Sequence, residues 1–138
     1  MNKVTEGLIK ARSFLKEPKV LAKGVRKDEN GGHCPLGLLD LAFGYDPENY
    51  GWPHECKQEY RLAILALAAA VPISYLVEAV EAWRGDNLPD EAQEIAPAAL
   101  AVVTYGNEEG FQAVCRMFDH AITIRQMEES LALKLEDA

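Results

Sequence analysis

The sequence predicts a mainly α-helical protein that forms a single compact domain of five or six helices over residues 1–138. Three observations predict this fold class. Apolar residues recur with the three- and four-residue spacing of amphipathic helices, most regularly over residues 111–122. Prolines and glycines punctuate the chain between such segments, with no internal repeat. At 138 residues, the chain is long enough to bury an ordinary hydrophobic core without a metal or a disulfide.

The first predicted helix covers residues 5–16, where Val4, Leu8, Ala11 and Leu15 share one face. Pro18 should end this helix, because the residue before a proline disfavours the helical conformation. The helical spacing of apolar residues is then lost between residues 20 and 34. The turn-forming residues at positions 28–32 predict a small β-hairpin or an ordered loop in this region.

A short apolar helix is expected to begin at Pro35, with Cys34 as its N-cap and Gly44 at its end. Residues 45–54 should form a loop, since they combine prolines and a glycine with the aromatic residues Tyr45, Tyr50 and Trp52. These aromatic side chains either anchor a partner or cover the protein's own core.

The alanine- and leucine-rich residues 55–71 predict the central helix, and Pro72 begins another helix that closes at residues 83–85. A weaker helix is expected over residues 95–105, with a break at Pro97 and a turn at residues 105–107. Asn107 is then the expected cap of the last helix, which extends beyond residue 126.

The net charge of −8 is distributed unevenly. Residues 1–27 contain eight bases and two acids, a net charge of +6, whereas the remainder contains six bases and 20 acids, a net charge of −14. An acidic surface repels phosphates, so direct binding of nucleic acid is disfavoured and a basic surface of another protein is the expected partner. The basic segment is expected to pair internally with the acidic remainder.

Localisation is expected to be cytoplasmic. The longest nearly uncharged run, residues 62–77, contains Pro72 and is shorter than the ~20 apolar residues of a membrane-spanning helix. Residues 1–15 carry charges throughout and lack the apolar centre of a secretion signal. Three cysteines are too few for a disulfide framework, and an odd number leaves one unpaired. Both observations favour a reducing compartment.

Several short motifs resemble an uncharacterised family of small bacterial and phage proteins. They are Lys23-Gly24, Gly32-His33-Cys34-Pro35-Leu36-Gly37-Leu38-Leu39, Val103-Thr104-Tyr105-Gly106-Asn107 and Phe118-Asp119-His120-Ala121-Ile122. The second is similar to the family's G-x-x-C-x-x-G-A-L segment with Leu38 in place of alanine, and the third has Tyr105-Gly106-Asn107 in place of W-N-D. The resemblance spans most of residues 5–124. It implies a fold pattern and a mobile-element origin, and brings no known reaction or ligand.

Two imidazoles and two thiols could supply a tetrahedral zinc site: His33, Cys34, His54 and Cys56. Their spacing argues against it, because zinc modules usually place paired ligands two to four residues apart. Cys34 is also the best candidate nucleophile, since a helix N-terminus favours the thiolate, with His33, His54 or His120 as its base. The alternative interpretation is a buried helix cap, and no cofactor is expected.

Acidic residues at positions 78–94, together with Glu108 and Glu109, predict a surface that imitates nucleic-acid phosphates and occupies a basic groove on a partner. The predicted partner-binding residues are Glu78, Glu81, Asp86, Asp90, Glu91, Glu94 and Trp52. A solvated helix exterior is the alternative interpretation. The predicted function is a non-enzymatic acidic protein-binding module, a phage-encoded inhibitor of a host or defence protein; the alternative is a thiol- or zinc-dependent enzyme centred on Cys34.

Overall fold

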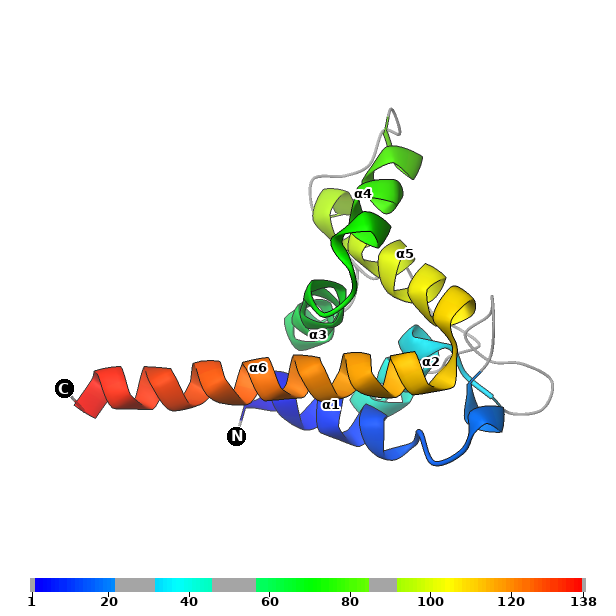
Figure 1. Ribbon diagram of the computed structural model, residues 1–138. Coiled ribbons are helices and arrows are strands. Elements are labelled where there is room, and N and C mark those ends of the chain that lie inside the picture. Colours follow the sequence, from blue (N-terminus) through cyan, green and yellow to red (C-terminus); the bar gives the residue numbers. More distant parts are fainter. Residues whose placement is uncertain (1, 22–31, 46–56, 85–91, 138) are drawn as a thin grey trace.

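A computed structural model describes residues 2–21, 32–45, 57–84 and 92–137 (Figure 1). Within these ranges the chain forms six α-helices and one short 3-10 helix. They are α1 (Lys3–Ser13), η1 (Pro18–Val20), α2 (Pro35–Phe43), α3 (Gln58–Ala69), α4 (Ile73–Ala82), α5 (Ala92–Glu109) and α6 (Phe111–Asp137). The predicted fold class, mainly α with five or six helices, is confirmed.

The core lies where α1, α2, α3, α5 and α6 meet. In Figure 1, α1 and α6 run antiparallel beside each other, and both contact α3. The helices contribute their apolar faces to one cluster of buried side chains, whose largest members are Tyr60, Phe118, Leu8, Leu38, Leu39, Ile64 and Leu67. Burial of these faces, rather than intrinsic helix propensity, holds helices of this length in place.

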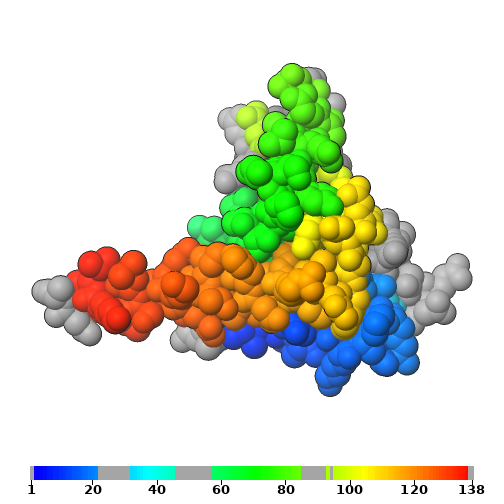
Figure 2. Space-filling view, in the orientation of Figure 1, coloured from blue at the N-terminus to red at the C-terminus, as the bar shows by residue number. Residues whose placement is uncertain are grey.

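Helices α4 and α5 form an arm that stands away from this body (Figures 1 and 2). The N-terminal end of α4 meets the C-terminal end of α5 at an edge-to-face contact between Tyr75 and Tyr105, whose ring centroids are 5.3 Å apart. This C-terminal end of α5 also leads into the body, where Gly106 lies against Pro35 of α2 and Val114 of α6, and the helix packs on α3 as well. No helix in the described part of the chain is both long enough and apolar enough to cross a membrane.

The ends of α1 and α2 follow from local capping chemistry. The side chain of Asn2 accepts hydrogen bonds from the backbone N–H groups of Val4 and Thr5, at 2.9 and 3.3 Å, so α1 begins at Lys3 instead of the predicted residue 5. Cys34 is the N-cap of α2 as predicted. Gly44 ends the helix with a φ of 82°, a left-handed conformation that favours glycine.

The β-hairpin predicted near residues 20–34 is not confirmed. The described ends of this segment form one isolated bridge between Leu21 and His33, in which the His33 N–H donates to the Val20 carbonyl at 2.6 Å. This bridge is parallel, whereas the strands of a hairpin are antiparallel. Residues 22–31 lie outside the described residues.

Helix α5 is longer than predicted. It passes through Pro97 and through the expected turn at residues 105–107, and ends at Glu109. Pro97 removes one backbone donor from the helix, and burial of Ile95, Ala98 and Val102 on one face offsets that loss. The break falls instead at Gly110, whose φ is 87°, so Asn107 does not cap α6.

Candidate functional site

The arm is strongly acidic. Residues 73–109, which include α4, α5 and their connection, contain eight acids and a single base, a net charge of −7. Neither α4 nor α5 contains a lysine or an arginine. The arm therefore carries half of the net charge of −14 predicted for the region after residue 27.

Helix α4 exposes an apolar stripe on this acidic arm. Ile73, Val77 and Val80 are 73%, 55% and 49% exposed, and their spacing of four and three residues aligns them on one face. The stripe is exposed because α4 packs mainly against α5, which covers the opposite face around Ala79. Contiguous apolar surface on a soluble protein commonly marks an interaction site.

The predicted partner-binding acids are only partly described. Glu78 and Glu81 are exposed on α4 beside the apolar stripe, and Glu81 lies 3.0 Å from Arg84 in an ion pair on the surface. Glu94 belongs to α5. The remaining predicted residues, Asp86, Asp90, Glu91 and Trp52, lie outside the described residues. Carboxylates beside an apolar stripe form a surface complementary to a basic partner that has an apolar centre.

The base of the arm has an electrostatically perturbed tyrosine. Burial, a hydrogen bond with Glu108 and the negative charge of Glu109 together raise the pKa of Tyr75 to about 12. The phenol stays neutral because its anion would lie among carboxylates. This hydrogen bond joins α4 to α5, and sequence reasoning missed it because the two residues are 33 positions apart.

The structure describes only part of the alternative enzyme or zinc site. Cys34 is 1% exposed in the core and His33 is also buried, whereas His120 is exposed on α6. His54 and Cys56 lie outside the described residues. Among the side chains that the structure does describe, no three His, Cys, Asp or Glu residues gather as metal ligands. The position of Cys34 is that of a buried helix cap.

Two other sequence interpretations are resolved by contacts within the chain. Arg12 from the basic N-terminal segment pairs with Asp119 on α6 at 2.8 Å, and this hydrogen bond raises the pKa of Arg12. Internal pairing of that segment is thus observed at Arg12. Tyr45 covers the core rather than presenting an anchor: its ring lies edge-to-face on Tyr60 and its hydroxyl accepts from the Lys57 N–H at 2.9 Å.

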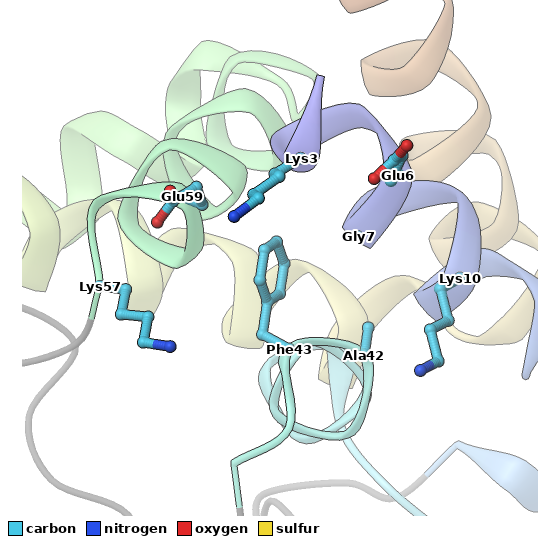
Figure 3. Close-up of a pocket in the computed structure, with 8 residues that line it drawn as sticks. All are labelled: Lys3, Glu6, Gly7, Lys10, Ala42, Phe43, Lys57 and Glu59. Carbon is cyan, nitrogen blue, oxygen red and sulfur yellow. The ribbon is translucent and has the colours of Figure 1, made fainter. Parts of the chain in front are cut away.

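A concavity of about 380 Å³ lies between α1, the end of α2 and the start of α3 (Figure 3). The ring of Phe43 stands at its centre, surrounded by the side chains of Lys3, Lys10 and Lys57. Two carboxylates, Glu6 and Glu59, complete the charged lining. Sequence reasoning missed this concavity because three separate elements form it. Its charges nearly balance, so it has little preference for an anion over a cation.

Comparison of the chain with models of known protein families, with curated proteins and with solved structures gave no match.

Proposed function

We propose that this protein is a non-enzymatic binding module that engages a basic surface of another protein through the α4–α5 arm. The observation that carries the proposal is the exposed stripe of Ile73, Val77 and Val80 beside Glu78 and Glu81, on an arm with a net charge of −7. An element that served only to complete the fold would turn its apolar residues inward, as α1 and α6 do where they meet the core.

The two halves of this surface have separate roles. The aliphatic side chains would supply affinity, since full burial of a valine or isoleucine is worth about 1.5–3 kcal/mol before the cost of association. The carboxylates would select a basic partner and speed its approach, because complementary charge raises association rates and repels acidic surfaces. Nucleic acid is disfavoured as a direct partner for the same reason.

The biological role that we propose is inhibition of a host or defence protein by a phage-encoded factor in the cytoplasm. The resemblance of residues 32–39 and 118–122 to a family of small bacterial and phage proteins suggests this role. An acidic arm that imitates phosphates would act by occupying a groove that its target uses for nucleic acid.

The test is affinity capture from host lysate with quantitative mass spectrometry on matched variants. Glu78→Lys/Glu81→Lys changes the charge on the arm, and Glu6→Lys/Glu17→Lys makes the same net change on exposed residues of the body. Val77→Glu tests the apolar stripe. A true partner is retained by the body variant and depleted by both arm variants, and raised salt releases it from the wild type.

The proposal would be wrong if every protein captured by the wild type were captured equally by both arm variants. Circular dichroism on each variant separates loss of binding from loss of fold. The three arm positions are exposed, so all variants are expected to remain helical.

A further inference from the structure

Helix α6 extends beyond the body of the protein (Figures 1 and 2). Its first half is anchored by the buried residues Val114, Met117, Phe118 and Ala121. Towards its C-terminal half, α6 is tied to α1 at Glu129, whose carboxylate accepts a hydrogen bond from the Thr5 hydroxyl at 2.6 Å. Residues 130–136 are exposed, so the end of this helix lacks the tertiary packing that normally stabilises short helical segments.

This projecting half of α6 carries a second apolar stripe. Ile124, Met127, Leu131 and Leu135 are 37%, 66%, 60% and 69% exposed. Their spacing of three, four and four residues places them within an arc of about 80°, since successive helical residues are about 100° apart. Leu133 is equally exposed, at 61%, but points to the opposite side of the helix.

The stripe is continuous with a groove between α3 and α6. This groove, of about 210 Å³, is lined on α3 by Leu62, Leu65, Ala66 and Ala69, and on α6 by Ala121, Ile124, Arg125 and Glu128. Ile124 belongs to both the groove and the stripe. The Nε atom of Arg125 is buried and has no hydrogen-bond partner among the described residues. The surface therefore offers apolar contact together with one unused buried donor.

We propose that a second copy of this chain covers the stripe, with the two α6 helices antiparallel and a two-fold axis at Leu131. In this arrangement a residue four positions before Leu131 faces one four positions after it, so Met127 faces Leu135 of the second copy. Leu131 packs on its own equivalent. The acidic end of the second helix, which includes Glu136, then approaches Arg125. Two-fold pairing of this kind buries the same patch on both copies and closes without forming filaments.

Charge favours a second copy in this orientation. Glu128 lies three positions before Leu131 and Lys134 three positions after it, so the two-fold axis brings these opposite charges together twice. A parallel pair would instead place Glu128 against Glu128 and Lys134 against Lys134, and juxtaposed like charges oppose association. The stripe is thus complementary to itself in both apolar spacing and charge. This surface is distinct from the α4–α5 arm, and the inference does not depend on the proposed function.

The test is the oligomeric state of the full chain, measured by sedimentation equilibrium over a range of concentrations. The wild type is expected to be a dimer. Leu131→Glu should raise the dimer dissociation constant by about a hundredfold or more, because it places two carboxylates at the two-fold axis. Leu133→Glu is the matched control: it has the same chemistry and nearly the same exposure on the opposite face, and it should remain dimeric.

A charge exchange tests the orientation. Glu128→Lys and Lys134→Glu should each weaken the dimer, and the double variant should restore it. A monomeric wild type at the highest concentration reached would overturn the proposal and assign the stripe to a different occupant, such as another protein. Equal effects of Leu131→Glu and Leu133→Glu, or failure of the double variant to recover, would also overturn it. Circular dichroism confirms that each variant stays folded.

Discussion

Tyr60 is a buried residue whose polar group can be removed without removing its ring. Its side chain is fully buried in the core, and its hydroxyl donates a hydrogen bond to the Asp40 carboxylate at 2.6 Å, with the Leu36 carbonyl 3.4 Å away. Asp40 is itself only 1% exposed. Tyr60→Phe deletes the donor and leaves the ring, so the edge-to-face contacts of Tyr60 with Phe43 and Tyr45 are retained.

The expected loss follows from the burial of the acceptor. Loss of one hydrogen-bond partner at a buried polar group costs about 1–3 kcal/mol, and Asp40 is buried. Tyr60→Phe should therefore lower the free energy of unfolding by about 2 kcal/mol. With an m-value near 2 kcal/mol/M, the urea midpoint should fall by about 1 M without a change in m.

The assay is urea denaturation followed by far-UV circular dichroism. The matched control is Tyr105→Phe, which deletes a hydroxyl from a half-buried ring and should change stability by about 0.5 kcal/mol or less. Asp40→Asn alone and combined with Tyr60→Phe completes a double-mutant cycle, which should give a non-zero coupling. If Tyr60→Phe lowered the free energy of unfolding no more than Tyr105→Phe does, the reasoning that the Tyr60–Asp40 hydrogen bond stabilises the fold would be refuted.

Three further predictions concern packing and pH. Gly7→Ala should lower the free energy of unfolding, measured by urea denaturation, by about 1 kcal/mol despite the higher helix propensity of alanine. The reason is that the new Cβ would lie 2.9 Å or less from ring atoms of Phe43. In a Phe43→Leu background the same change should be neutral or stabilising. Spectrophotometric titration should show Tyr75 ionising near pH 12. Because this pKa is raised from 10.0, the contribution of Tyr75 to stability is complete below pH 10 and is lost as the pH rises towards 12. Tyr75→Phe should therefore remove that part of the loss of stability at alkaline pH. The hydrogen bond from Thr5 lowers the pKa of Glu129 in the folded protein. The contribution of ionised Glu129 to stability is therefore present above pH 4.5 and is lost as the pH falls through its lowered pKa. Glu129→Gln should reduce the loss of stability at acid pH, as measured by thermal unfolding.

Sequence reasoning succeeded where local chemistry decides the structure. The pairing of Cys34 and Pro35 with Gly44 defines α2, because cap and proline preferences act over a few neighbouring residues. The spacing of Phe111 to Ile122 predicts α6, since this period aligns one apolar face. The same reasoning failed at Pro97 and Asn107, because burial of the α5 face outweighs local helix-breaking preferences and carries the helix on to Gly110.

The candidate site divides in the same way. The excess of acids after residue 27 and the helical period of residues 73–82 are properties of the chain itself, and both were readable without a structure. The spacing of apolar residues alone does not show which face of a helix is covered by other helices. Ile73, Val77 and Leu131 have the spacing of core residues, yet they are exposed because α4 meets mainly α5 and the end of α6 extends beyond the body. Exposure depends on neighbours that are distant in sequence, so only the tertiary arrangement could turn these apolar residues into candidate interfaces.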